Sequence, residues 1–295
     1  MNTFSSVPVA GVEARPFIDG GGEIRQLALL APTPAVFPST FRQVVTNPAV
    51  HSSLLKQMQR LRGEVYLDDG AIQPADLDET GCHVMPADSQ GVHVLALNQQ
   101  GKVVGCSRFL LHHPDICFEQ LAVARSPLAR DPILGVALRA AVSAHLASAR
   151  ERGYLYFELG GWALHPSIRH STEAVRIAAL NFSLGLALGG AAAICTATVR
   201  NHSAMILRRI GGRPLSCNGF TIPPYYDPRY QCEIEVLAFD SDLIPERHAP
   251  RVQQLRATLN DTPVLCNQSS SGSSLIRLYQ AIESETRVPS HLAAA

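Results

Sequence analysis

The middle of the chain alternates between strand-like and helix-like runs. An aromatic-rich strand is predicted from Tyr154, an apolar helix over 173–188, and a strand of small and β-branched residues over 191–199. A helix between two strands returns the chain to its starting edge, so the two strands pair in parallel. This succession predicts parallel strands at the centre of a sheet that helices cover.

Elements on either side add antiparallel edges to this centre. Val92–Leu97 and Lys102–Leu111 are typical of a hairpin, and the alternating run Cys232–Phe239 is predicted as the closing strand. The further predicted elements are a helix that begins after Asn47, a strand at Phe118–Ala124, a helix from Pro132 to Gly153, and a helix at His202–Ile210 capped by Asn201. The predicted fold class is therefore α/β, with a central mixed sheet and helices on both faces.

The length of 295 residues suits one large domain with extensions. We expect an N-terminal arm over 1–40, because a run of three glycines and several prolines break regular structure there. The folded domain is expected over 41–241. The remainder, 242–295, is predicted as a helical extension and tail, with helices near 249–259 and 274–284.

Composition argues against several function classes. Hydrophobic residues make up 46% and charged residues 17% of the chain, and 25 basic residues balance 25 acidic ones. A nucleic-acid-binding protein normally carries a basic excess, so no nucleic-acid partner is expected. The longest apolar stretch, 174–194, contains Arg176 and the Gly189-Gly190 pair. It is therefore predicted as a buried helix rather than a membrane span.

The seven cysteines show no CxxC or CxxH spacing, so no metal site is predicted. Their odd number, and the lack of a basic-then-apolar N-terminal pattern, favour reduced thiols and a cytoplasmic protein. Cys106 and Cys195 stand in apolar strands, where a free cysteine usually packs in the core.

Two segments in the second half resemble the GNAT superfamily of N-acyltransferases. The strand Phe157–Leu164 is followed by Arg169-His170-Ser171-Thr172-Glu173-Ala174, which is similar to the family's loop R/Q-x-x-G-x-G/A, with Thr172 in a glycine position. The run 192–203 resembles the next strand and the N-x-x-A/S start of the helix that follows it.

The resemblance implies a fold and a set of contacts. The first N–H groups of a helix have no hydrogen-bond partner within it and can bind anions, so the loop is expected to hold the pyrophosphate of a pantetheine carrier. The residues implied for carrier binding are Arg169, Ser171, Thr172 and Asn201.

The first half is similar to one branch of that superfamily, the acyl-homoserine-lactone synthases and N-acyl amino acid synthases. Leu61–Tyr66 resembles their R-x-x-V-F segment, and Val103–Arg108 resembles their glycine-containing strand with its arginine. Phe118–Val123 resembles their E-x-x-R-(L/F)-A-V strand without the arginine. The resemblance implies that Arg62 and Arg108 organise the acceptor side of the site.

These similarities allow two registers for the fourth strand of the fold. One uses Phe118–Ala124, with 130–137 as the phosphate loop. The other uses Tyr154–Leu164, with Arg169–Ala174 as the loop. We favour the second, because it leaves a complete strand–helix–strand succession behind it.

Acyl transfer to an amine needs a base for the amine proton and donors for the thioester oxygen. Glu119 and Glu158 lie in predicted apolar strands and are candidate catalytic bases, and Arg108 is expected to join Glu119 in one polar network. The alternative for each carboxylate is an outward-facing side chain paired with an arginine.

Four further residues are candidates for substrate binding. Arg62 suits a carboxylate, and His165 suits a base near neutral pH. Tyr225 and Tyr226, in the stiff segment Pro223–Tyr230, are expected to wall the acceptor or acyl pocket. The alternatives are a surface ion pair, a loop histidine, and tyrosines that cover a sheet end or a dimer contact.

The sequence thus predicts an N-acyltransferase that moves an acyl group directly from acyl-CoA or acyl-carrier protein to an amino acid or small amine. Acyl-CoA or acyl-phosphopantetheine is the expected co-substrate, and no tightly bound cofactor is expected. No GxSxG signature points to a covalent intermediate. A short-chain acetyltransferase using acetyl-CoA and a non-catalytic GNAT-like binding module stay open as alternatives, as do a monomer and a homodimer.

Overall fold

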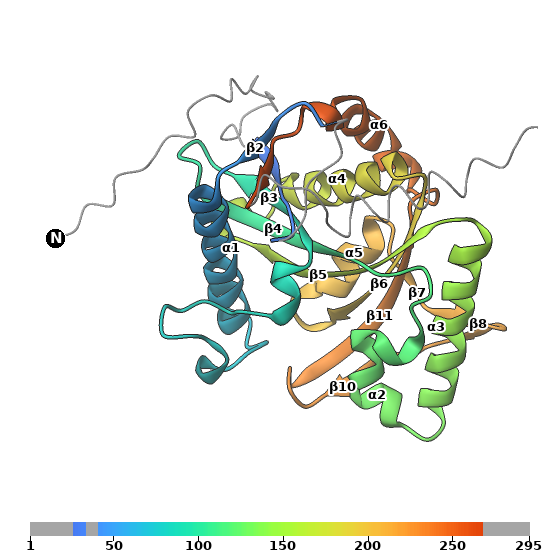
Figure 1. Ribbon diagram of the computed structural model, residues 1–295. Coiled ribbons are helices and arrows are strands. Elements are labelled where there is room, and N and C mark those ends of the chain that lie inside the picture. Colours follow the sequence, from blue (N-terminus) through green and yellow to red (C-terminus); the bar gives the residue numbers. More distant parts are fainter. Residues whose placement is uncertain (1–25, 34–40, 268–295) are drawn as a thin grey trace, which may run out of the picture.

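The computed structural model describes residues 26–33 and 41–267 (Figure 1). Its helices are α1 (Pro48–Asp68), α2 (Pro127–Arg130), α3 (Leu134–Glu151), α4 (Glu173–Ala187), α5 (Ser203–Arg209) and α6 (Ala249–Thr258). Its strands are β1 (Gln26–Leu30), β2 (Val44–Thr46), β3 (Val92–Leu97), β4 (Val103–Leu111), β5 (Leu155–Leu164), β6 (Ala191–Thr198), β7 (Arg213–Pro214), β8 (Ser216–Cys217), β9 (Phe220–Thr221), β10 (Tyr225–Asp227), β11 (Cys232–Asp240) and β12 (Val264–Cys266).

Within the described residues, ten strands form one mixed sheet in the order β10-β11-β6-β5-β4-β3-β1-β12-β2, with β7 beside β11. The strands β1, β3, β4 and β5 are antiparallel neighbours, β5 and β6 are parallel, and β6, β11 and β10 are again antiparallel. The predicted mixed sheet and its parallel centre are confirmed.

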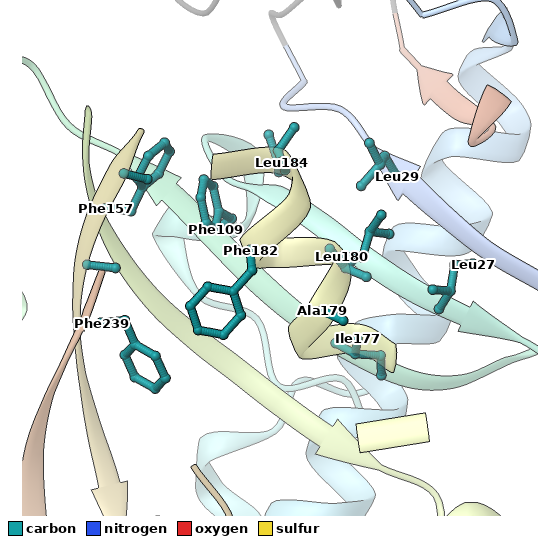
Figure 2. Packing of buried hydrophobic residues seen from close by; sticks show 14 of the residues in the cluster. Leu27, Leu29, Phe109, Phe157, Ile177, Ala179, Leu180, Phe182, Leu184 and Phe239 are labelled. Atoms are coloured by element: carbon teal, nitrogen blue, oxygen red, sulfur yellow. The ribbon is translucent and has the colours of Figure 1, made fainter. Parts of the chain in front are cut away.

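Helices cover both faces of this sheet (Figure 1). On one face lie α4, α5 and α6, and on the other lie α1 and α3. Figure 2 shows Ile177, Leu180 and Leu184 of α4 among the side chains of the sheet. Leu180 is fully buried, so its truncation to alanine is expected to cost roughly 2–5 kcal/mol.

Local sequence explains the start of α1. The Asn47 side chain accepts a hydrogen bond from the Val50 N–H at 3.1 Å, and Pro48 occupies the first turn, where its missing N–H costs nothing. The apolar stripe that includes Leu54 and Met58 packs against the sheet. This helix is therefore confirmed as the sequence predicts it.

The predicted strand at Phe118–Ala124 is wrong. The segment forms two 3₁₀ turns, Phe118–Gln120 and Ala122–Arg125, in which Leu121 N–H bonds to the Phe118 carbonyl and Ala124 N–H to the Leu121 carbonyl. These local bonds use the backbone groups that a sheet ladder would need.

The predicted N-cap role of Asn201 is also wrong. Asn201 lies within a 3₁₀ turn at Arg200–His202, and His202, in a left-handed conformation with φ of +61°, occupies the N-cap position of α5. The helix therefore begins one residue later than the sequence suggests.

The sheet extends beyond the predicted folded domain of 41–241. The predicted arm contains β1, which pairs with β3. The predicted extension contributes β12, which pairs with β1 and β2. Helix α6 confirms the prediction near 249–259. The helix predicted near 274–284 lies outside the described residues. No described helix has the length and apolar character needed to cross a membrane.

Candidate active site

The two central parallel strands separate part-way along their length. Strands β5 and β6 form four residue pairs, the last of which is Glu158 opposite Ile194. Beyond it, β5 continues to Leu164 and β6 to Thr198 without pairing to each other. The facing edges therefore present backbone N–H and C=O groups to whatever lies between them.

A bulge in β5 lies at the same place. Its register with β4 shifts between the pairs Arg108–Gly160 and Cys106–Ala163, so β5 holds one extra residue there. Gly161 has φ of +61°, a left-handed conformation that favours glycine. Because a bulge bends its strand, it accounts for the separation of β5 from β6.

A cavity of about 420 Å³ fills the space between the separated strands. It passes through the sheet, because its lining includes both Cys195, which packs in the core on the α4 face, and Ile194, which packs in the core on the α3 face. The volume lies in the range of pockets that hold small molecules.

On the α4 face the cavity forms a mostly apolar chamber, which we call the α4-side chamber. Phe182 of α4 and Phe239 of β11 line it, with their ring centroids 6.2 Å apart (Figure 2). Other apolar side chains of its wall include Phe109, Leu159, Trp162, Ala193, Cys195 and Leu207. Such a surface suits a hydrocarbon chain, because burial removes apolar area from water.

Glu158 lies where the strands part, on the opposite face of β5. Its carboxylate accepts a hydrogen bond from the Ala122 N–H at 2.7 Å and lies 2.8 Å from Nε2 of His112. Glu158 also lines the cavity. The two contacts hold the carboxylate in place, and a fixed carboxylate at this point can accept a proton from an amine.

Arg62, Asp88 and Arg108 form a buried cluster beside the cavity. The Asp88 carboxylate accepts hydrogen bonds from Arg62 at 2.6 and 2.8 Å, and Nη1 of Arg108 lies 3.4 Å away from it. Arg62 is 0% exposed and also donates to the carbonyl oxygen of His83. Burial alone would raise the pKa of Asp88, but hydrogen bonds and charge from Arg62 outweigh it and lower the pKa to about 2. The cluster carries a net positive charge.

Cations dominate the mouth of the cavity on this side. Arg108, Arg125 and Arg229 all line it, and Glu158 is the one carboxylate among the described lining residues. Arginine binds carboxylates through paired hydrogen bonds. The mouth therefore favours a ligand that carries negative charge.

Among known proteins, the chain is similar to solved structures but not to known sequences. No protein-family model and no curated protein sequence matches the chain. The CoA-dependent acyl-homoserine lactone synthase BjaI, solved with SAM and isopentyl-CoA, is similar over 88% of this chain and 99% of its own, with a TM-score of 0.50 and 13% identity.

The chain has a GNAT-like, acyl-homoserine-lactone-synthase-like fold. FeeM, an N-acyl amino acid synthase from uncultured soil microbes, matches over 75% of this chain and 93% of its own, with a TM-score of 0.44 and 12% identity. The acyl-homoserine-lactone synthase LasI matches over 75% and 91%, with a TM-score of 0.43 and 13% identity.

Only one of the two predicted registers places a strand where the GNAT-like fold needs it. Strand β5 runs into α4 and pairs in parallel with β6, as the register built on Tyr154–Leu164 requires. The register built on Phe118–Ala124 is wrong, because that segment forms turns.

The structure places Arg108 and Glu158 in the lining of one cavity and Arg62 beside it, bonded to Asp88, but Glu119 lies elsewhere. Glu119 is 56% exposed and forms an ion pair with Arg139 of α3. The predicted network of Arg108 and Glu119 is therefore wrong. The physical reason is the 3₁₀ turn, which directs Glu119 to the surface, whereas Arg108 lies in the sheet.

The predicted carrier-binding residues Arg169, Ser171 and Thr172 lie in the loop between β5 and α4. Thr172 occupies the N-cap position of α4, and Ser171 Oγ accepts a hydrogen bond from the Glu173 N–H at 3.2 Å. Arg169 lies 3.8 Å from Asp69. Binding of a pyrophosphate here stays a prediction.

The remaining predicted substrate residues do not line the cavity. His165 is bonded to the Ser167 side chain at 2.8 Å. Tyr225 and Tyr226 lie in β10, where alternation buries the first in the α3-side core and leaves the second 58% exposed. Tyr230, from the same segment, does line the cavity.

Sequence reasoning missed Asp88 and His112. Asp88 lies in a 3₁₀ turn at Pro86–Ser89, and nothing local marks it as the partner of Arg62. A signal for the strand of Glu158 was present. The segment Glu158–Leu164 has the length of the pattern E-x-x-R-(L/F)-A-V and keeps its Glu and Ala, whereas Gly161, Trp162 and Leu164 stand in the other defined positions.

Proposed function

We propose that this protein is an N-acyltransferase that moves an acyl group from a pantetheine thioester to the amine of an amino acid. The observation that supports this is the cavity between β5 and β6, which joins the apolar α4-side chamber to a cationic mouth at Glu158. Such a cavity can hold a hydrocarbon chain on one side of the sheet and a charged acceptor on the other.

The donor thioester lies between the separated strands. An extended ligand with amide groups can pair with exposed strand edges, as peptides do when they add to a sheet. The pantetheine arm of CoA, which contains two amides, has this chemistry. Its amides then pair with the free edges of β5 and β6, and the acyl chain enters the α4-side chamber. The phosphates extend toward the N-terminus of α4, where the helix dipole favours an anion.

Glu158 acts as the general base. The amine nitrogen attacks the thioester carbonyl, a C–N bond forms, and the C–S bond breaks. Glu158 accepts the proton that the amine loses and later releases it to solvent, and the departing thiolate takes up a proton from solvent. Burial raises the pKa of Tyr66 and of Tyr230, so both phenols at the mouth stay protonated and can donate hydrogen bonds to the developing negative charge.

The acceptor carries a carboxylate. Arg108 is fixed by Asp88, and Arg125 and Arg229 line the same mouth from other elements. Three guanidinium groups around one carboxylate base suit an amino acid with a free carboxylate better than an uncharged amine.

The acyl group is larger than acetyl. The α4-side chamber extends to Phe182 and Phe239, and binding sites usually bury most of their ligand in close contact, so an acetyl group would leave this chamber unfilled. The chamber therefore favours a long or bulky acyl group over the acetyl-CoA alternative.

The test is to incubate the protein with acyl-CoAs of graded chain length and a mixture of amino acids and simple amines, and to detect products by mass spectrometry. We expect an N-acyl amino acid. Glu158→Gln should lower kcat by about a hundredfold or more, because a positioned base contributes roughly 10²–10⁴ to the rate. Glu119→Gln is the matched control and should stay within about twofold, since Glu119 lies outside the cavity. Absence of any acyl product and of CoA binding would contradict the proposal.

A further inference from the structure

Two polar side chains with incomplete hydrogen bonding interrupt the apolar wall of the α4-side chamber. Ser107 projects from β4 and Asn181 from α4, and both line the cavity. Their neighbours in the wall are apolar, among them Phe109, Phe182 and Trp162. A third polar residue of the chamber, Ser241, is already engaged, because its hydroxyl accepts the Ala191 N–H at 2.9 Å.

The hydrogen bonds of this pair are incomplete. Asn181 Nδ2 donates to Ser107 Oγ at 3.0 Å. Asn181 Oδ1 is buried and has no partner among the described residues. The Ser107 hydroxyl is buried too, and within the described part of the chain no acceptor takes its proton. The amide oxygen of Asn181 thus lacks a hydrogen-bond donor, and the neighbouring Ser107 hydroxyl lacks an acceptor.

An unmade bond in an apolar wall is costly, and native proteins rarely keep one without a purpose. A half turn of the Asn181 amide does not remove the problem. Oδ1 would then accept from Ser107, and Nδ2 would be the group without a partner, because the amide has one polar atom on each side. Either orientation leaves a polar group of Asn181 for a ligand in the chamber.

We propose that the acyl group held in this chamber carries a hydroxyl group, and that Asn181 and Ser107 select it. The inference rests on the proposed function, since it concerns the acyl donor of that reaction. A hydroxyl both donates and accepts, so it can donate to Asn181 Oδ1 while it accepts from the Ser107 hydroxyl.

The same geometry ranks other acyl groups. A ketone only accepts, so it satisfies Ser107 and leaves Asn181 Oδ1 unpaired. A methylene at the same position satisfies neither group. Sites built to bond a substrate hydroxyl reject the analogue that lacks it, because their own polar groups are then buried without partners. The expected order of kcat/KM is hydroxyl, then ketone, then methylene.

The test compares acyl-CoAs of one chain length that carry a hydroxyl at successive positions with the matching oxoacyl and unsubstituted thioesters. The wild type should prefer one hydroxyl position over the unsubstituted chain by at least about tenfold in kcat/KM. Asn181→Leu and Ser107→Ala should bring that ratio close to one by lowering kcat/KM for the hydroxyacyl thioester.

Ser183→Ala is the matched control, because Ser183 is a buried serine of the same helix that bonds within the protein, to the Ala179 and Val252 carbonyls, and does not line the cavity. It should keep the wild-type ratio. A wild-type ratio near one at every hydroxyl position, with unsubstituted acyl-CoA still transferred, overturns this inference and leaves the proposed function intact. Failure to transfer any acyl group at all counts against the proposed function instead.

Discussion

Replacing Asp88 with asparagine tests the buried charge cluster. Asp88 holds Arg62 through two hydrogen bonds and Arg108 through a longer contact, and it also accepts from Gln59 Nε2 at 3.1 Å. Asparagine keeps the size of the side chain but removes its charge and turns N–H groups toward a guanidinium. Arg62, which is 0% exposed, is then a buried cation without a counter-ion.

Removing one partner of a buried ion pair costs about 3–5 kcal/mol. The pKa of Asp88 gives a smaller, independent value. A pKa lowered from 3.8 to about 2 corresponds to about 2 kcal/mol of stabilisation of the charged form in the fold. Because the folded pKa lies below the unfolded one, this stabilisation is present above about pH 4 and is lost as the pH falls toward 2. The asparagine variant should lose more than this, since it also adds donors where acceptors are needed.

The assay is urea unfolding at pH 7 of the wild type, Asp88→Asn and the control Asp261→Asn. Asp261 pairs with Arg42 on the surface, so its variant should change the free energy of unfolding by less than about 1 kcal/mol. Asp88→Asn should also raise the KM of the acceptor, because Arg108 loses the contact that positions it. A loss of stability no larger than that of the control would refute the reasoning.

Three further predictions follow from the site and its surroundings. Burial lowers the pKa of His93 from 6.5 to about 4, so the neutral ring stabilises the fold fully above pH 6.5, and about 3 kcal/mol of this is lost as the pH falls through 4. His93→Gln should therefore flatten this part of the curve of unfolding free energy against pH, and an unchanged slope would contradict the prediction. In calorimetry, each added methylene of the acyl chain should lower the Kd of an acyl-CoA about fourfold until the α4-side chamber is full, and Cys195→Phe should make the Kd level off at a shorter chain. A Kd that does not depend on chain length would contradict an acyl chamber. The double variant Arg125→Gln, Arg229→Gln should raise the KM of an amino acid but not of its methyl ester, and an equal effect on both would remove these arginines from carboxylate binding.

The centre of the fold could be predicted because its signals are local. The apolar helix over 173–188 lies between two short apolar runs, and this succession fixes a parallel pair before any distant contact is known. The hairpin of β3 and β4 shows a regular alternation around a turn. For these elements pattern and structure agree.

The edges of the sheet could not be predicted because they depend on distant pairing. Strand β1 has five residues and is stabilised by β3 on one side and β12 on the other, more than 230 residues further along the chain. A run so short carries little information of its own. At Phe118–Ala124 the apolar residues suggested a strand, but local turn bonds take its place.

The candidate site could be predicted only in part, for a related reason. The sequence singles out Arg62, Arg108 and Glu158 as candidates because each lies in a recognisable helix or strand pattern, and the fold places them at or beside one cavity. Asp88 and His112 were missed because their importance comes only from the partners that the fold brings to them. Glu119 was wrongly assigned to the site because the short pattern E-x-x occurs in two segments, and the pattern alone does not show which of them forms the strand at the site.

The central claim is that a pantetheine thioester lies between β5 and β6 with its acyl chain in the α4-side chamber. A crystal structure of the protein with a non-hydrolysable S-alkyl-CoA tests it most directly. We predict that the pantetheine amides bond to the facing edges of Gly160–Leu164 and Cys195–Thr198, and that the alkyl chain contacts Phe182 and Phe239. A CoA bound at another surface, or an alkyl chain that lies outside the chamber, would contradict the account.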